Sequence, residues 1–173
     1  MKGGTSRETR AAHYCFSKSM NTKPTIYDPR KRQVQVLLTD TFQLGCVLES
    51  LLAFTGEADI TVSTYSTGEE FLRKLLALRR KGLVRSAHLF TDFKAAEKTA
   101  RVNPILRAAY DEVRFCQNHS KVMIIEGTFP VLVLSSQNQT RGNRLENYAI
   151  LQSREAADYC LSTLRELATY KVL

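Results

Sequence analysis

The chain has 173 residues, of which 43% are hydrophobic and 24% are charged, and its formal net charge is +8. This length suits one domain with a single core, and this composition excludes a wholly disordered or fibrous chain. No apolar stretch reaches the ~18 residues that a membrane-spanning helix needs. Residues 1–20 carry several charged side chains and no long apolar run, so we expect no secretory signal and a cytoplasmic protein.

The positive charge is concentrated near the N-terminus. Residues 1–32 hold eight lysines and arginines but only two acidic residues, and the rest of the chain is close to neutral. Such a segment suits an anionic partner such as nucleic acid, although it also suits a solvated tail. We therefore divide the chain into a basic, flexible arm over residues 1–32 and a folded domain over residues 33–173. Within the arm, Arg30, Lys31 and Arg32 are candidate contacts for nucleic acid.

The first part of the domain alternates predicted strands with predicted helices. Apolar and polar residues alternate in the strands, whose expected ranges are residues 33–38, 58–65, 86–91 and 112–116. Apolar residues recur at helical spacing between them, and the three helices are expected to begin at Asp40 or Thr41, at a capping box of Thr67 and Glu70, and at Phe93. Gly56 and Gly82 are expected to end the first two helices, and Pro104 to interrupt the third.

After residue 116 the pattern changes to strands without helices between them. These strands are expected over residues 121–126, 130–135 and 146–151, and residues 154–170 form an amphipathic segment that predicts a closing helix. A βαβαβ unit followed by a β-meander and a C-terminal helix predicts an α/β fold, in which helices cover a mixed β-sheet. His88 falls inside a predicted strand and is expected to be a packed core residue.

Polar side chains suited to phosphate chemistry flank two consecutive strands of the meander. His119 and Lys121 are two positions apart, so both project to one face of an extended chain, and Ser136 and Asn138 repeat that spacing after the next strand. If the two strands are neighbours, these four side chains converge. Lysine and amide donors hold phosphoryl oxygens, while an imidazole attacks phosphorus or moves a proton. Glu146, at the start of the following strand, is placed to fix the tautomer of His119.

This ordered set resembles the motif of the phospholipase D superfamily, in particular its small bacterial nucleases with a single motif. The family pattern is His-x-Lys-x-x-x-x-Asp followed by Gly-Ser-x-Asn, and this chain has H-S-K-V-M-I-I-E and S-S-Q-N. Glu126 stands where the family has its supporting aspartate, and Ser135 stands where the family has glycine. The resemblance implies a single half of the phospholipase D fold over about residues 33–170.

The resemblance also implies a metal-independent phosphodiesterase that needs no cofactor. His119 attacks phosphorus and forms a phosphohistidine, a second histidine protonates the leaving oxygen, and water then releases the product. Lys121 and Asn138 neutralise the phosphate oxygens, Ser136 assists, and Glu146 orients the imidazole. Because the chain carries one copy of the motif, the second histidine is expected from a second chain, in a homodimer with a shared active site.

DNA or RNA is the favoured substrate, because the chain is basic and lacks a lipid-sized apolar appendage. Arg141 and Arg144, which lie between the last two strands of the meander, are further candidate contacts for nucleic acid. Two alternatives remain open. One is a catalytically degenerate nucleic-acid-binding module of the same fold, and the other is a phosphodiesterase that acts on a phospholipid or another small diester.

Overall fold

The computed structural model of the protein describes residues 16–19, 25–96, 103–140 and 144–172. The strands are β1 (Phe16–Ser19), β2 (Val34–Thr39), β3 (Ala58–Thr64), β4 (Val84–Asp92), β5 (Glu112–Cys116), β6 (Val122–Glu126), β7 (Pro130–Ser135), β8 (Glu146–Leu151) and β9 (Thr169–Val172). The helices are α1 (Leu44–Thr55), α2 (Glu69–Arg80), α4 (Asn103–Ala109) and α5 (Arg154–Glu166), with a short 3₁₀ helix, η1 (Phe93–Ala95). None of these helices is long and apolar enough to cross a membrane.

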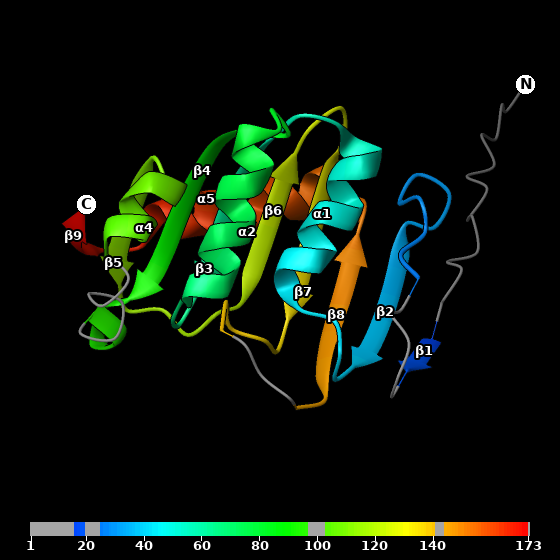
Figure 1. Ribbon diagram of the computed structural model, residues 1–173, viewed down its shortest axis with the longest axis horizontal. Coiled ribbons are helices and arrows are strands. Elements are labelled where there is room, and N and C mark those ends of the chain that lie inside the picture. Colours follow the sequence, from blue (N-terminus) through cyan, green and yellow to red (C-terminus); the bar gives the residue numbers. More distant parts are fainter. Residues whose placement is uncertain (1–15, 20–24, 97–102, 141–143, 173) are drawn as a thin grey trace, which may run out of the picture.

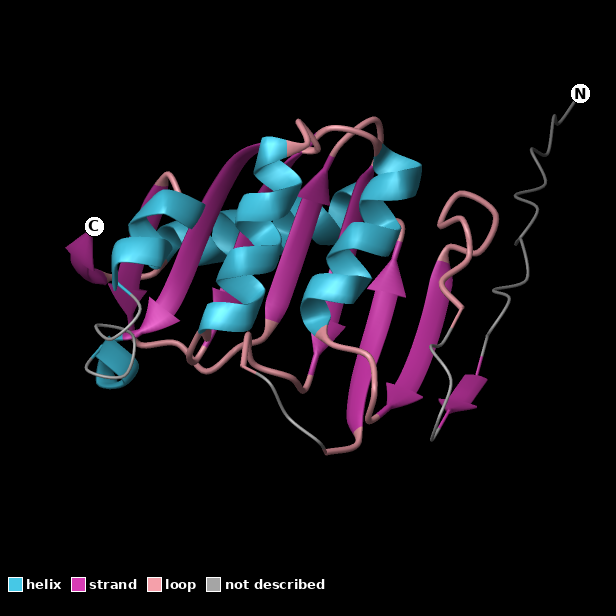
Figure 2. Ribbon diagram, viewed as in Figure 1, coloured by secondary structure: helices cyan, strands magenta, loops and turns pink. Residues whose placement is uncertain are grey.

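The described strands form one nine-stranded mixed sheet in the order β1-β2-β8-β7-β6-β3-β4-β5-β9. Helices α1, α2 and α4 cover one face, and α5 lies on the opposite face (Figure 1). Colouring by secondary structure shows the same layers, with the sheet between the helices (Figure 2). The expected α/β fold, with a βαβαβ unit, a meander and a C-terminal helix on a mixed sheet, is confirmed.

The parallel and antiparallel parts of the sheet meet at β3. This strand pairs in parallel with β4 and antiparallel with β6, which in turn pairs antiparallel with β7. Val122, the first residue of β6, therefore lies between Ser63, near the end of β3, and Leu134, near the end of β7. The C-terminal ends of β3 and β7 and the start of β6 thus lie together at one end of the strands. We call this end of the sheet, which runs across the strands, the site edge.

The larger core lies between the sheet and helices α1, α2 and α4. Leu48 and Leu51 of α1 and Leu72 and Leu75 of α2 are fully buried there. Burial of one such side chain contributes about 1.5–3 kcal/mol to folding. The apolar stripes that predicted these two helices are therefore the surfaces that hold them on the sheet.

Helix α5 covers only part of its own face. Its apolar side chains pack on Ile124 and Leu132 of the meander. Leu134 is two residues beyond Leu132 and so points to the same face, but it is 39% exposed. Leu38 of β2 is 42% exposed. The strand register continues this uncovered area through Val36, Leu38, Leu134 and Ala149, which together we call the exposed strip.

The start of α1 differs from the prediction. The helix begins at Leu44 with Gln43 as its N-cap, and not at Asp40 or Thr41. Leu44 N donates to Gln137 Oε1 at 2.9 Å. A side chain distant in sequence therefore satisfies a first-turn donor that a local cap was expected to take.

The predicted capping box of α2 does not form. The N-cap is Gly68, and no side chain caps the helix. Thr67 instead forms an isolated bridge with Gln139, and Gly68 N donates to Gln139 O at 2.8 Å. This pairing with the segment after β7 fixes the backbone of Thr67, and its hydroxyl is buried without a partner among the described residues.

Both predicted glycines end their helices. Gly56 and Gly82 end α1 and α2 with φ of +70° and +69°, a backbone conformation that glycine adopts without strain. Pro104 is the second residue of α4, a position where its missing N–H costs nothing, and residues 97–102, where the predicted interruption would fall, lie outside the described residues.

Both ends of the described chain add strands that the sequence analysis did not predict. The closing helix ends at Glu166, and Thr169–Val172 form β9, antiparallel to β5. Without β9, the hydrogen-bonding groups of β5 would be open to solvent or to another chain. At the other end, β1 lies parallel to β2 within the predicted arm, whose residues 1–15 and 20–24 lie outside the described residues.

His88 is not a packed core residue, contrary to the prediction. It points to the face that α5 only partly covers, and its side chain is 39% exposed. Its Nδ1 lies 3.5 Å from Glu112 Oε2 of the neighbouring strand. His88 stays near solvent because its partner Glu112 is polar and because α5 covers this face only in part.

Candidate active site

His119 and Lys121 lie at the site edge, in the loop that joins β5 to β6. Lys121 Nζ donates to His119 O at 2.8 Å and lies 3.4 Å from its Nδ1. The imidazole is exposed, and its centroid lies 5.2 Å from that of the Tyr65 ring, which follows β3. The structure thus places an accessible imidazole and a cation side by side, as the sequence analysis expected.

A buried polar network holds the loop that carries His119. Asn118 is buried, and its Nδ2 donates to Ser63 Oγ at 2.7 Å and to Phe90 O at 3.1 Å. Its Oδ1 accepts from Ser120 N at 2.9 Å and from Ser120 Oγ at 2.7 Å. Both neighbours of His119 are therefore tied to the sheet, which limits the positions that the imidazole can take.

Asp92 connects this network to the end of β4. The carboxylate is buried, and it accepts from Asn118 N at 2.9 Å and from Lys94 N at 2.8 Å, so that it also caps η1. The sequence analysis missed Asn118, Ser120 and Asp92. The available signal was residue type, since Asn, Ser and Asp next to a strand end commonly bond loop backbone.

The second motif segment lies next to the first because β6 and β7 are neighbouring strands. Ser135 N donates to Lys121 O at 3.0 Å, which continues the pairing beyond β6. Asn138 Oδ1 accepts from Thr64 Oγ1, at the end of β3, at 3.3 Å. Lys121, just before β6, and Asn138, just after β7, are thus both held at the site edge.

Glu146 contacts Ser136 within the chain. Ser136 Oγ donates to Glu146 Oε2 and accepts from Asn147 N at 3.0 Å. Among the described residues, no hydrogen bond joins Glu146 to His119, the partner expected from the sequence. The carboxylate still acts on the site, because its charge partly opposes the burial that lowers the pKa of Lys121.

Glu126 lies away from the other motif residues. It ends β6 at the edge opposite His119, and its Oε1 accepts from Arg154 Nη1 at 3.3 Å. Arg154 is the first residue of α5. The extra methylene relative to aspartate is therefore accommodated in an ion pair that joins α5 to the sheet, and within one chain the carboxylate does not reach the imidazole.

The basic residues that were predicted to contact nucleic acid divide between the site edge and the opposite end of the strands. Arg30, Lys31 and Arg32 precede β2 at the edge opposite His119, since Val34 pairs with the last residue of β8. The guanidinium carbon of Arg30 lies 5.2 Å from the ring centroid of Phe129, in the turn between β6 and β7. These cations therefore lie far from the site edge.

Arg144 lies at the site edge. It is exposed and stands two residues before Glu146, in the segment that leads into β8. Arg141 falls outside the described residues. Of the predicted nucleic-acid contacts that the structure describes, Arg144 is the one placed beside the candidate chemistry.

No protein-family model matches the sequence, and a sequence search against curated proteins finds no match. The fold is similar to that of Nuc from Salmonella typhimurium, a phospholipase D family member, with a TM-score of 0.60 and 19% identity over 80% of this chain and 97% of that one. It is also similar to phosphatidylserine synthase from Haemophilus influenzae, with a TM-score of 0.56 and 14% identity, and this chain spans 40% of that protein. TrmBL2, an archaeal chromatin protein with a novel mode of DNA binding, matches with a TM-score of 0.51 and 10% identity over 78% of this chain and 52% of TrmBL2. The chain thus shares the fold of Nuc, a phospholipase D family member, and this agrees with the fold that the motif resemblance implies.

Proposed function

We propose that this chain is a metal-independent phosphodiesterase that hydrolyses DNA or RNA through a phosphohistidine intermediate. The observation that supports the proposal is that His119, Lys121 and Asn138 lie at the same edge of a phospholipase D-type sheet. An exposed imidazole, a neighbouring cation and an amide form a set suited to a phosphoryl group. The positive net charge of the chain supports nucleic acid as the substrate.

In the proposed first step, His119 Nε2 attacks phosphorus, the new P–N bond forms, and the bond to the leaving oxygen breaks. A second histidine donates a proton to that oxygen. In the second step the same histidine removes a proton from water, which attacks phosphorus and breaks the P–N bond. Lys121 and Asn138 stabilise the negative charge that develops on the phosphoryl oxygens.

The second histidine is supplied by a second copy of the chain, in a homodimer with one shared site. A twofold axis brings the same patch of both chains together, so two His119 side chains face each other. Attack by Nε2 also requires an acceptor for a proton on Nδ1, and within one chain this nitrogen faces Lys121 Nζ. We propose Glu146 as that acceptor, although in the single chain its carboxylate accepts from Ser136 instead. The exposed strip offers an apolar surface for the contact.

The test is an assay of plasmid, single-stranded DNA and RNA in excess chelator, with His119→Ala and His88→Ala compared. His119→Ala is expected to abolish cleavage, and His88→Ala to retain it, because His88 lies away from the site edge. During turnover of the parent protein, an alkaline quench should trap an acid-labile phosphoprotein. Strict dependence on a divalent metal, or full activity of His119→Ala, would overturn the proposal.

A binding module without turnover is the second candidate, and the likeness to TrmBL2 favours it. It predicts salt-dependent binding to DNA with no cleavage. The likeness to phosphatidylserine synthase favours a lipid phosphodiester instead, which predicts cleavage of a generic diester without affinity for nucleic acid. We propose a cytoplasmic location as part of the nuclease function, because a nuclease must share a compartment with its nucleic-acid substrate.

A further inference from the structure

Two aromatic side chains are exposed together at the site edge, on the side of β4 and β9. Phe93, the first residue of η1, is 37% exposed, and Tyr170 of β9 is 64% exposed. Their ring centroids lie 4.9 Å apart, and the ring planes are tilted by 41°. We call these two residues the aromatic pair. Because the rings are in contact, they form one aromatic surface that is open to solvent.

Hydrogen bonds and strand pairing place the aromatic pair near the loop of His119. Asp92, which precedes Phe93, accepts through its carboxylate from Asn118 N at 2.9 Å, and Asn118 precedes His119. Tyr170 lies on β9, whose first residue pairs with the last residue of β5, and that residue pairs in turn with Asp92. Since β4 is the second strand from β6, the pair begins about 10 Å along the site edge from β6, a distance that a few nucleotides span.

The surroundings of the pair suit a phosphate backbone with unpaired bases. Lys94 is exposed, and its Nζ lies 5.9 Å from the ring centroid of Phe93 and has no carboxylate partner among the described residues. Tyr65, at the end of β3, lies between the pair and His119 in strand order, and its ring contacts the imidazole. Proteins that bind single strands combine cations of this kind with aromatic rings on which bases stack.

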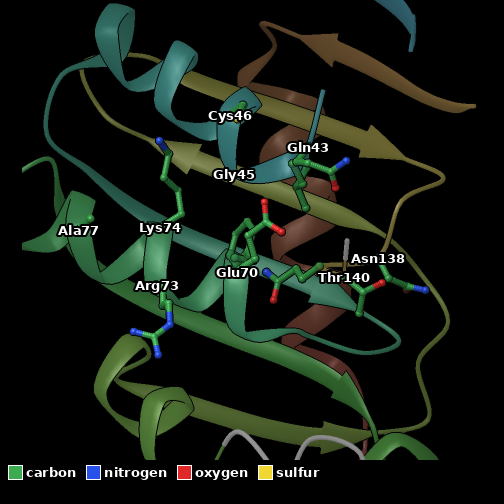
Figure 3. Close-up of a pocket in the computed structure, with 12 residues that line it drawn as sticks. Gln43, Gly45, Cys46, Glu70, Arg73, Lys74, Ala77, Asn138 and Thr140 are labelled. Carbon is green, nitrogen blue, oxygen red and sulfur yellow. The ribbon is translucent and has the colours of Figure 1, made fainter. Parts of the chain in front are cut away.

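The cavity next to the second motif segment is less suited to a nucleic-acid strand. It has a volume of about 360 Å³, and Figure 3 shows Arg73 and Lys74 among its lining residues. Both cations are engaged, because Arg73 donates to Glu69 and Lys74 Nζ donates to Glu49. Lys94 is the cation without such a partner, so we expect the strand to run from the motif residues toward β4 and β9.

We propose that the aromatic pair stacks the unpaired bases of a single-stranded nucleic acid whose scissile phosphate is held at His119. The inference rests on the proposed nuclease function and adds its substrate class. Every base has a π-face, so stacking on Phe93 and Tyr170 selects single strands without selecting a sequence. In a duplex the bases are stacked on one another, and exposing their faces costs unpairing. Lys94 complements a phosphate of the same strand.

The aromatic pair is separate from the surface assigned to the homodimer. The exposed strip lies on β2, β7 and β8, on one side of β6 in the sheet, whereas β4 and β9 lie on the other side. A contact through the strip therefore does not cover the pair. Each chain of the dimer can then hold a strand that leads away from the shared site.

The sequence contains no tryptophan, so one substitution introduces a specific reporter of stacking. Phe93→Trp, in the non-cleaving His119→Ala background, is titrated with a thymine oligonucleotide and with an abasic strand of the same length. The thymine strand is expected to quench the indole emission, because a base stacks on the ring, and the abasic strand to leave it unchanged. The control is Tyr159→Trp, at an exposed position of α5, which should show no quenching with either strand.

Removal of the rings tests their contribution to affinity. In the same background, Phe93→Ala and Tyr170→Ala are each expected to raise the Kd of the thymine strand at least about fivefold, the lower end of the effect of one base–aromatic stack. The Kd of a duplex should stay unchanged, and so should both Kd values in Tyr159→Ala. Phe93→Tyr keeps the π-face and should keep the parent Kd, which separates loss of stacking from loss of folding.

These outcomes are distinct from failure of the nuclease proposal. If the protein hydrolyses bis-p-nitrophenyl phosphate but binds no nucleic acid, nuclease function and the stacking surface fail together. If the parent cleaves DNA or RNA but both alanine variants keep the parent Kd, or the abasic strand quenches as the thymine strand does, the nuclease proposal stands and the stacking surface is overturned. A lower mass of Phe93→Ala in light scattering without nucleic acid would assign the pair to a contact between copies of the chain instead.

Discussion

At the scale of single residues, the position of His119 depends on a neighbour that takes no part in the proposed chemistry. Asn118 bonds Ser63, Phe90 and Ser120, and all these bonds lie beneath the imidazole-bearing loop. A side chain that places a reacting group in this way affects the rate through geometry, since small displacements at a reacting centre are costly. Asn118 is therefore a positioning residue.

We expect Asn118→Ala to lower the free energy of unfolding by about 1–3 kcal/mol, because it removes the partners of several buried polar groups. It should also lower kcat more than it raises KM, since Lys121 and Asn138 still bind the phosphate. Urea unfolding and steady-state kinetics measure the two effects. The control is the exposed Gln117→Ala, expected to stay within about 0.5 kcal/mol of the parent. An Asn118→Ala protein with parent stability would contradict the network.

Lys121 gives the reaction a predictable pH dependence. Burial lowers the pKa of its ammonium group, and the charge of Glu146 only partly opposes this. A lysine is charged below its pKa, so Lys121 loses its charge at a lower pH than an exposed lysine does. We expect kcat/KM to fall on the alkaline side as that charge is lost. Lys121→Arg, which stays charged, should move the fall to higher pH, and an unmoved alkaline limb would assign it to another group.

At the scale of elements, the sequence predicted those features that local periodicity determines. The strands of the meander and both helix-ending glycines follow from patterns of neighbouring residues, and they were confirmed. The predicted caps of α1 and α2 were wrong because residues distant in sequence intervene. Gln137 accepts from the first turn of α1, and Gln139 pairs with Thr67, the predicted cap of α2. The polar network around Asn118 was missed for the same reason, since it exists only once β3, β4 and β6 lie together.

Strand β9 shows why the C-terminal segment was assigned to the wrong element. The amphipathic pattern of α5 continues to residue 168, and nothing in that stretch indicates that β5 has an open edge to fill. We expect deletion of residues 169–173 to lower the thermal midpoint and to cause concentration-dependent association, because β5 becomes an exposed edge. Thermal unfolding and light scattering provide the measurements. Tyr170→Ser, which keeps the backbone pairing, should retain both properties of the parent.

At the scale of the whole molecule, the basic residues divide into two groups with different expected roles. Arg144 lies at the site edge, whereas Lys31 lies at the opposite edge. In a non-cleaving His119→Ala background, we expect Arg144→Ala to reduce the log–log salt dependence of single-strand binding by about 0.7, the value of one phosphate contact. Lys31→Ala should leave it unchanged. The reverse result would mean that the strand passes over the edge of Arg30 and Lys31.

The exposed strip makes the proposed homodimer testable by a change outside the set of side chains proposed to act on the phosphate. Leu134 is 39% exposed on a face where its neighbour Leu132 is buried by α5. We expect Leu134→Glu to give a folded monomer, because a carboxylate buried in an apolar contact is strongly unfavourable. This monomer should be as inactive as His119→Ala. The control is Leu145→Glu, at a residue that is 64% exposed and lies outside the strip, which should remain dimeric and active by light scattering and assay.

A mixing experiment separates a shared site from two independent sites in the same dimer. If each site requires the histidines of both chains, a dimer of one parent chain and one His119→Ala chain is inactive. After subunit exchange, activity per parent chain should therefore fall in proportion to the fraction of parent chains, so total activity follows the square of that fraction. Independent sites predict instead that activity per parent chain stays constant at every ratio. A constant value, measured with a folded and dimeric His119→Ala protein, would place both reaction steps within one chain and leave the second proton donor to be found among its own residues.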